Sequence, residues 1–299
     1  MSAEIVLQTD HLTKDYGQGR GIFELSLQVN RGEIFGLLGT NGAGKTTTIR
    51  SLLGFIRPDG GSCSVCGLDS WTQSAQIMKH VSYIPGEIAF PSFPTGTAFL
   101  QNQAELLGLR DLSRTHHLIE VLRLDPSADL KRMSKGMKQK TAIVAALMAD
   151  REVLILDEPT TGLDPLMRDS FLELLREEKA KGRTVLMSGH IFEEIEEVCD
   201  RAAMLRDGRL LEGIDLNAKR HSRRKRFTLS FADPMAAEGF AREMGGEAAA
   251  EGTVCTLSIP VEELNRMFAL SRKHGVKRLS EQHFSLAEHF MEVYKGAET

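Results

Sequence analysis

Residues 34–47, which read IFGLLGTNGAGKTT, decide the fold of this 299-residue chain. The apolar run at 34–38 predicts a buried strand, and the pattern that follows residue 46 predicts a helix. Between them, residues 39–46 match G-x-x-x-x-G-K-[ST], in which glycines let backbone N–H groups surround phosphate oxygens. The positive end of the following helix points at the same oxygens. The candidate nucleotide-binding residues are therefore Gly39, Thr40, Asn41, Gly42, Ala43, Gly44, Lys45, Thr46 and Thr47.

Two side chains at the end of this loop have separate expected tasks. Lys45 supplies positive charge to the β- and γ-phosphates, and the Thr46 hydroxyl is a candidate ligand for Mg²⁺. The alternative is a glycine-rich turn that only resembles a phosphate cradle. The Lys-Thr pair and the strand–loop–helix context favour a nucleotide-binding site.

Outward from this loop, short apolar runs alternate with stretches of helical pattern up to about residue 215. This alternation predicts an α/β domain whose sheet is mostly parallel. The expected strands are 34–38, 81–84, 153–156 and 184–187, and the expected helices are 46–55, 114–124, 137–149, 165–181 and 191–199.

Polar side chains follow two of these expected strands. Ligands of an open parallel sheet bind at the carboxyl ends of its strands. Asp157 is therefore a candidate Mg²⁺ ligand, directly or through water. Glu158 is the candidate general base for the water that attacks the γ-phosphate, and His190 is the candidate γ-phosphate contact. The alternatives are that the two acids cap the following turn and that His190 is structural.

Composition and charge exclude several classes of protein. Charged residues make up 26% of the chain and hydrophobic residues 41%, which is ordinary for a globular protein. The net charge of −4 does not indicate a generally positive surface of the kind that binds nucleic acid. No apolar run approaches the roughly 20 residues that span a bilayer, and we recognise no secretion signal. The four cysteines do not form a disulfide framework, and strand alternation explains the C-x-x-C spacing of Cys63 and Cys66 without a metal.

The pattern changes near residue 215. A basic run at 219–226, KRHSRRKR, is interpreted most simply as a solvated linker, with a contact to lipid headgroups as the alternative. Beyond it, the pattern predicts strands at 227–231 and 254–259 and helices at 235–244, 261–274 and 286–294. We therefore expect two domains, one at 1–219 and a small α+β domain at 220–299.

Together these motifs resemble the ATP-binding cassette (ABC) family of ATPases over about residues 5–215. The resemblance implies a P-loop NTPase cassette with a mostly parallel core sheet, an antiparallel β subdomain and a helical subdomain, followed here by the small C-terminal α+β domain. It implies ATP and Mg²⁺ as cofactors. It also places the adenine-stacking aromatic on Tyr16, for which an ordinary edge-strand aromatic is the alternative.

The family's signature corresponds to residues 133–140, MSKGMKQK. The resemblance implies that its first residues contact ATP held by a second subunit, so that two cassettes packed head to tail share each site. The family usually has Ser-Gly-Gly-Gln at the corresponding positions, so this chain departs at the second and fourth of them. The four signature residues here are Ser134, Lys135, Gly136 and Met137.

Two further loops carry family features. Residues 161–164 resemble the loop through which the two subunits sense each other, and Asp164 in it also suits a helix N-cap. After the strand at 81–84 the family usually places a glutamine that reaches Mg²⁺, whereas this chain has Gly86 and then Glu87. Either Glu87 takes over the metal contact or that contact is absent, so Glu87 is a third candidate metal ligand.

The resemblance implies an ATP-hydrolysing subunit that drives a separate integral-membrane permease chain. The segment 85–108 lies where the family docks its permease, and local packing of a helical subdomain is the alternative. The end of the chain looks like that of drug, antibiotic-peptide or polysaccharide exporters. We therefore expect an exporter subunit at the cytoplasmic face of the cell membrane, paired with a second ATPase subunit (a homodimer) and not with nucleic acid.

Three other functions are weighed against this one. An importer subunit carries the same cassette. Soluble ABC ATPases act on nucleic acid, but they carry two cassettes or long coiled coils, and this chain shows neither. A cassette that binds ATP without hydrolysing it is disfavoured, because Glu158 is present as a base.

Overall fold

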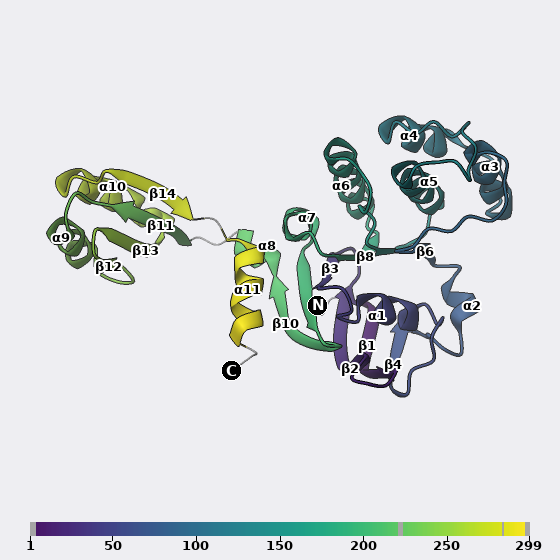
Figure 1. The fold of residues 1–299 in the computed structure, drawn as a ribbon, viewed down its shortest axis with the longest axis horizontal. Helices are drawn as coiled ribbons and strands as arrows, with labels where there is room; N and C mark the ends of the chain where they lie inside the picture. The colour runs from purple at the N-terminus through teal and green to yellow at the C-terminus, as the bar shows by residue number, and fades with distance from the viewer. Residues whose placement is uncertain (1–3, 221–223, 283, 297–299) are drawn as a thin grey trace. The chain divides into compact units, whose positions relative to one another are not determined.

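The computed structural model describes residues 4–220, 224–282 and 284–296. The chain divides into two compact units: the first runs up to Leu216 and includes a segment that begins at Leu286, and the second is Asn217–Ser285. Figure 1 shows both units. Every helix in the described ranges falls short of the length and apolar character needed to cross a bilayer.

A six-stranded sheet with the order β10-β9-β3-β8-β7-β6 forms the base of the first unit. All neighbours in it are parallel except the edge pair β10/β9. Every residue of β3, β7 and β8 is buried, which explains the continuous apolar runs in the sequence. The prediction of a mostly parallel core sheet is confirmed. The strands are β3 (Ile34–Gly39), β6 (Val81–Ile84), β7 (Val153–Asp157), β8 (Thr184–Gly189), β9 (Arg201–Arg206) and β10 (Arg209–Asp215).

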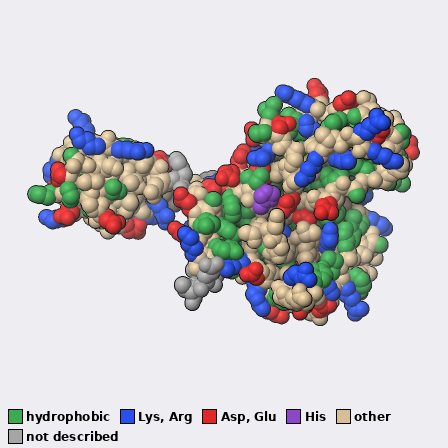
Figure 2. All heavy atoms as spheres, in the orientation of Figure 1, with side chains coloured by type: hydrophobic (Ala, Val, Ile, Leu, Met, Phe, Trp, Pro, Cys, Tyr) green, Lys and Arg blue, Asp and Glu red, His purple; other side chains and the backbone are tan. Residues whose placement is uncertain are grey.

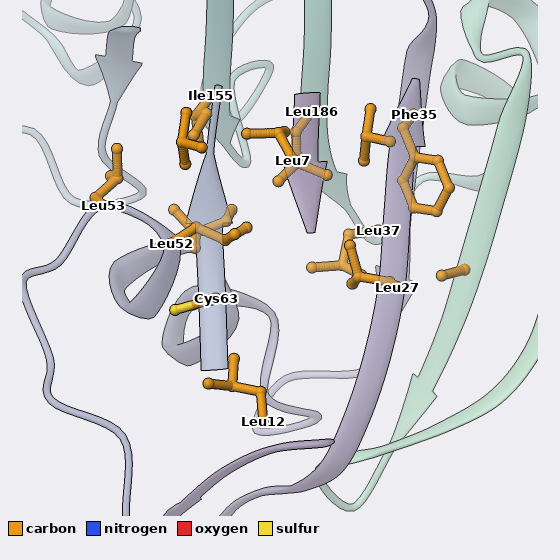
Figure 3. Close-up of a cluster of buried hydrophobic side chains, with 14 of the residues drawn as sticks. Leu7, Leu12, Leu27, Phe35, Leu37, Leu52, Leu53, Cys63, Ile155 and Leu186 are labelled. Carbon is orange, nitrogen blue, oxygen red and sulfur yellow. The ribbon is translucent and has the colours of Figure 1, made fainter. Parts of the chain in front are cut away.

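A second, antiparallel sheet packs against this one, with helix α1 (Lys45–Leu52) contributing to the shared core. In Figure 3, leucines from the antiparallel sheet face Phe35 and Leu37 of β3, and Ile155 and Leu186 lie in the same cluster. The loop that follows β3 is therefore attached to a strand that is fixed in a close-packed core without water. The second sheet has the order β2-β1-β4-β5 and consists of β1 (Ile5–Asp15), β2 (Gly21–Asn30), β4 (Gly60–Val65) and β5 (Leu68–Asp69).

The helices of the first unit include a group inserted between β6 and β7. In that group the segment 85–108 contains α3, and the rings of Phe90 and Phe93 pack edge-on against Phe99, with centroids 4.8 and 5.7 Å apart. These aromatics therefore pack on one another within the segment. The expected docking of a permease on this segment stays a prediction. The helices that follow α1 in this part of the first unit are α2 (Ser74–Ile77), α3 (Gly96–Leu106), α4 (Ser113–Val121), α5 (Lys135–Leu147), α6 (Pro165–Ala180) and α7 (Phe192–Val198). Helix α8 (Leu216–Arg220) begins at the last residue of this part of the first unit, and its other residues belong to the second unit.

The second unit has the chain order β11-α9-β12-β13-α10-β14 and a sheet with the order β12-β13-β11-β14. Each strand pair is antiparallel, as in a split βαββαβ motif. Its core is separate from that of the first unit and centres on Phe240, Leu229 and Leu257. The elements are β11 (Arg224–Ser230), α9 (Pro234–Met244), β12 (Ala249–Glu251), β13 (Val254–Pro260), a 3₁₀ turn (Val261–Glu263), α10 (Leu264–Lys273) and β14 (Arg278–Gln282).

The basic run at 219–226 is not the simple linker that we expected. Its first two residues belong to helix α8, and its last three begin β11, where Lys225 forms an ion pair with Glu281 at 2.6 Å. Residues 221–223 of the run lie outside the described residues. Strand pairing with β13 explains the difference, because alternate residues of β11 point into the core.

The expected boundary of the C-terminal domain also differs from the structure. Helix α11 (Leu286–Gly296) belongs to the first unit and not to the second. Leu286 is fully buried, and the ring of Phe290 lies 4.9 Å from that of Phe192 on α7. Burial of this apolar face explains why α11 packs against the first unit, and the sequence pattern alone could not assign it a partner.

Because the second unit has its own core, truncating a side chain in that core should destabilise the second unit and leave the first unit unchanged. Phe240→Ala should destabilise the second unit by about 3–5 kcal/mol, because Phe240 is fully buried. Hydrogen exchange should rise for amides of β11 and β13 and stay unchanged in β3 and β7. Met235→Ala on the same helix is the control, because Met235 is 82% exposed. Equal loss of protection in both units would contradict two separate cores.

Candidate functional site

The loop between β3 and α1 is held at its ends and open in its middle. A Cβ atom at Gly39 would lie 2.7 Å from the carbonyl oxygen of Leu205, and one at Gly44 would lie 2.7 Å from Ile22 Cγ2. Gly44 also has a φ of 106°, which favours glycine. Gly42 has no heavy atom within 4 Å of a Cβ position. The open space beside Gly42 is what a bound phosphate chain requires of this loop.

Lys45 and Thr46 point from the start of α1 toward the carboxyl end of β7. Lys45 is 5% exposed; its Nζ donates to the carbonyl oxygen of Gly39 at 2.8 Å and lies 3.6 Å from Glu158 Oε1. The Thr46 hydroxyl donates to Asp157 Oδ2 at 2.7 Å. The structure thus brings together the loop and the acids that the sequence predicted to share one ligand.

Glu158 lies between Lys45 and His190. Its carboxylate is 3.4 Å from His190 Nδ1, so residues that follow β7 and β8 meet at one edge of the sheet. Glu158 has a φ of 48°, a left-handed conformation that is uncommon outside glycine. Such backbone strain persists only where surrounding contacts hold the residue in place.

Ser188 is a site residue whose role the sequence did not reveal. Its hydroxyl donates to Asp157 Oδ1 at 2.6 Å and accepts from the backbone N–H of Glu158 at 3.0 Å. It is fully buried, and it ties the Asp157 carboxylate to the backbone of Glu158. The only signal in the sequence was its position beside the expected end of a buried strand.

The loop after Glu158 is fixed by two further buried polar groups. Gln139 of α5 donates to the carbonyl oxygen of Pro159 at 2.6 Å. Thr160 donates to Glu194 of α7 at 2.7 Å. Burial raises the pKa of Glu194, although the Thr160 hydrogen bond and the Arg168 guanidinium oppose this shift. Sequence reasoning missed these contacts, because their partners are distant along the chain.

Gly86, and not Glu87, lies beside the buried carboxylate. A Cβ atom at Gly86 would lie 3.2 Å from Asp157 Oδ2, so any side chain at this position would cover Asp157. Glu87 is exposed, and within the described ranges it makes no hydrogen bond or ion pair to the site residues. The expected role of Glu87 as a metal ligand therefore stays a prediction.

The residues expected to meet a second subunit lie at the exposed start of α5. Ser134 is exposed and caps α5 by accepting from the Met137 N–H at 3.2 Å. A Cβ atom at Gly136 would lie 2.7 Å from the carbonyl oxygen of Gly162, so the start of α5 touches the loop at 161–164. Asp164 caps α6 by accepting from the Met167 N–H at 3.0 Å, as its sequence context predicted.

Tyr16 follows β1 and is 50% exposed. Its ring centroid lies 5.9 Å from Lys14 Nζ, and its backbone N–H donates to the carbonyl oxygen of Arg20. A half-exposed ring next to a strand is available to stack on a planar ligand.

On the face of the first unit drawn in Figure 2, acidic and basic side chains are interspersed.

The arrangement has the parts that phosphoryl chemistry needs. A glycine loop and a helix N-terminus can hold phosphates, and Lys45 can neutralise their charge. Asp157 and the Thr46 hydroxyl offer oxygen ligands of the kind that Mg²⁺ prefers. Glu158 is a carboxylate placed to accept a proton from water.

Comparisons with known proteins agree with this geometry. The family model described as "ABC transporter" matches residues 22–161. The bacitracin transport ATP-binding protein BcrA of Enterococcus faecalis is 32% identical over 99% of this chain and 98% of that protein. The Nod factor export ATP-binding protein I of Ralstonia nicotianae is 38% identical over 68% of this chain and 65% of that protein. A solved ATP-binding subunit of an ABC transporter is 33% identical, with a TM-score of 0.65, over 72% of this chain and 92% of that one.

The position of Ser188 predicts a stability effect at the site. Ser188→Ala should lower the free energy of unfolding of the first unit by about 1–3 kcal/mol, because it leaves Asp157 and the Glu158 N–H each without one buried partner. Denaturant titration measures this change. Ser170→Ala is the control, because the half-buried Ser170 bonds to the carbonyl oxygen of Leu166 one turn earlier in α6, and that bond is exposed to solvent. Equal stability of the two variants would contradict the bridging role.

Proposed function

The chain belongs to the ABC transporter family as an ATP-binding and ATP-hydrolysing subunit, and from this premise we propose that it drives export through a separate membrane permease. The similarity to a bacitracin transport protein and to a Nod factor export protein supports export over import. The convergence of the 39–46 loop, buried Asp157 and Glu158 at one edge of the core sheet carries the ATPase part of the proposal.

ATP binding falls to the loop and to one aromatic ring. The backbone N–H groups of residues 39–47 bind the β- and γ-phosphates, and the Lys45 ammonium neutralises part of their charge. Tyr16 stacks on the adenine, which its exposure permits. One chain thus supplies the phosphate loop and the adenine-stacking ring of one ATP site.

Thr46 and Asp157 are the residues that would hold Mg²⁺, and Glu87 is a third candidate on its sequence position alone. When bound, the cation would neutralise charge on the β- and γ-phosphate oxygens. The donor set fits this assignment, because it consists of one hydroxyl and one carboxylate held together at 2.7 Å.

Hydrolysis depends on the residues that follow β7 and β8. Glu158 orients the attacking water and accepts its proton as the bond to the γ-phosphorus forms. His190 contacts the γ-phosphate from the neighbouring strand end, and its proximity to Glu158 supports this role. Ser188 keeps the Asp157 carboxylate oriented and anchors the backbone of Glu158 during the step.

A second copy of the chain would complete each site. The exposed start of α5 presents Ser134 and Lys135, with a helix N-terminus that suits an anion. Gly136 and Met137 complete the signature, and Asp164 lies in the loop that would report on the partner subunit. Bound to a separate permease chain, the ATPase pair would act at the cytoplasmic face of the membrane.

Replacing the base predicts a specific loss of turnover. Glu158→Gln should lower the kcat of ATP hydrolysis by about 10²–10⁴-fold and leave the Kd for ATP within a few-fold of wild type. Turnover and equilibrium nucleotide binding are measured on the same preparation. Glu193→Gln is the matched control, because Glu193 is exposed in the first turn of α7. Turnover that is lost equally in both variants would argue against a base at 158.

The membrane partner can be captured with the same variant. We expect Glu158→Gln, loaded with ATP and isolated from detergent-solubilised membranes, to co-purify with an integral-membrane chain at two copies of the ATPase. Lys45→Ala, which should not bind ATP, is the control and should recover less of the complex. Recovery of the ATPase dimer without a membrane chain would contradict the transport proposal.

Tight RNA or DNA binding that weakens steeply with salt would favour the soluble alternative.

A further inference from the structure

Three metal-ligating side chains converge at the end of the core sheet opposite the nucleotide site. They are Cys66, which follows β4, His80, which precedes β6, and Glu152, which precedes β7. One ligand atom from each residue lies within 4.8 Å of the other two. All three residues belong to the first unit. The cluster therefore joins the turn of the antiparallel sheet to the amino ends of two parallel strands.

The Glu152 carboxylate divides its two oxygens between different partners. Oε2 lies 3.0 Å from Arg31 Nη1, and Arg31 is also paired with Glu4. Oε1 lies 2.6 Å from His80 Nδ1 and 3.6 Å from Cys66 Sγ. The guanidinium thus fixes the carboxylate with one oxygen directed at the thiol and the imidazole. This is the support from a neighbouring side chain that protein metal ligands usually have.

We propose that Cys66, His80 and Glu152 bind one Zn²⁺ ion. Thiolate, imidazole and carboxylate are the three ligand types that zinc takes from proteins. Zinc–ligand distances of about 2.0–2.3 Å place tetrahedral ligand atoms about 3.4 Å apart. The separation between Cys66 and Glu152 is already close to this value, and that between His80 and Glu152 needs to open by less than about 1 Å.

The surroundings leave room for an ion to enter. The side chains of His80 and Glu152 are 44% and 38% exposed, so a water molecule can take the fourth ligand position. Burial and the Glu152 charge raise the pKa of the Cys66 thiol to about 11, so the thiol is protonated in the metal-free chain. Formation of the Zn–S bond must therefore release this proton to solvent. The Cys66 thiolate and Glu152 carboxylate then balance the charge of the ion.

The two cysteines of the C-x-x-C pair have different surroundings. Cys63 is 5% exposed in the core between the two sheets, and its thiol donates to the carbonyl oxygen of Ser51. Cys66 occupies the first position of a two-residue turn between β4 and β5, with a φ of 52°. Glycine or asparagine is usual at this backbone conformation. The Cys66 side chain packs against the edge of the same core, and its thiol is directed at Glu152. His80 and Glu152 are distant from Cys66 in the chain, so the C-x-x-C spacing alone does not indicate this group.

Zinc titration of the full chain tests the site. Metal-free protein is titrated with Zn²⁺ against a chromophoric chelator, with excess Mg²⁺ present to occupy the carboxylates of the nucleotide site. We expect one Zn²⁺ per chain, and Cys66→Ser and His80→Asn should each weaken binding by about 100-fold or more. The controls Cys255→Ser and His11→Asn should bind as wild type, because Cys255 lies in the second unit and the exposed His11 imidazole pairs with Asp10.

Cobalt provides a second readout that does not depend on any variant. Co²⁺ bound to the wild-type chain should give a thiolate-to-metal charge-transfer band, and added Zn²⁺ should remove it. Absence of this band in folded wild-type protein overturns the proposal. Zinc affinity that is unchanged in Cys66→Ser also overturns it, because the ion then lies elsewhere. Circular dichroism of each variant separates loss of the site from loss of the fold.

Discussion

A carboxylate that is almost completely removed from water determines the architecture of the nucleotide site. Asp157 is 1% exposed, and a charge in such a place is tolerated only when it is fully hydrogen-bonded. The hydroxyls of Thr46 and Ser188 supply those bonds. Because the three residues come from β7, α1 and β8, one charge ties the phosphate loop to two strand ends. Small displacements of any of these elements would leave it unpaired.

Much of the core and of the site could be predicted from the sequence, for physical reasons. β3, β7 and β8 are buried along their whole length, so each had to be a short apolar run. The loop at 39–46 and the start of α6 at Pro165 have strict local residue requirements that the sequence displays. These features depend on neighbouring residues, which a single sequence shows directly.

The features that could not be predicted depend on partners far along the chain. Ser188 is an ordinary strand residue until Asp157 is placed beside it, and the short strand β12 exists only because β13 pairs with it. The same applies to α11, whose apolar face was visible in the sequence while its partner α7 was not. These hydrogen bonds and strand pairings join residues that are far apart in the sequence. They can therefore be identified only once the fold is known.

The return of α11 to the first unit has a consequence for how the protein is made. The second unit is an insertion, because the first unit continues on both sides of residues 217–285. The ribosome must therefore complete the whole insertion before α7 can acquire the Phe290 ring that covers Phe192. Until then, an apolar surface of the first unit remains open to solvent and to chaperones. An ATPase truncated after the cassette would keep that surface exposed permanently.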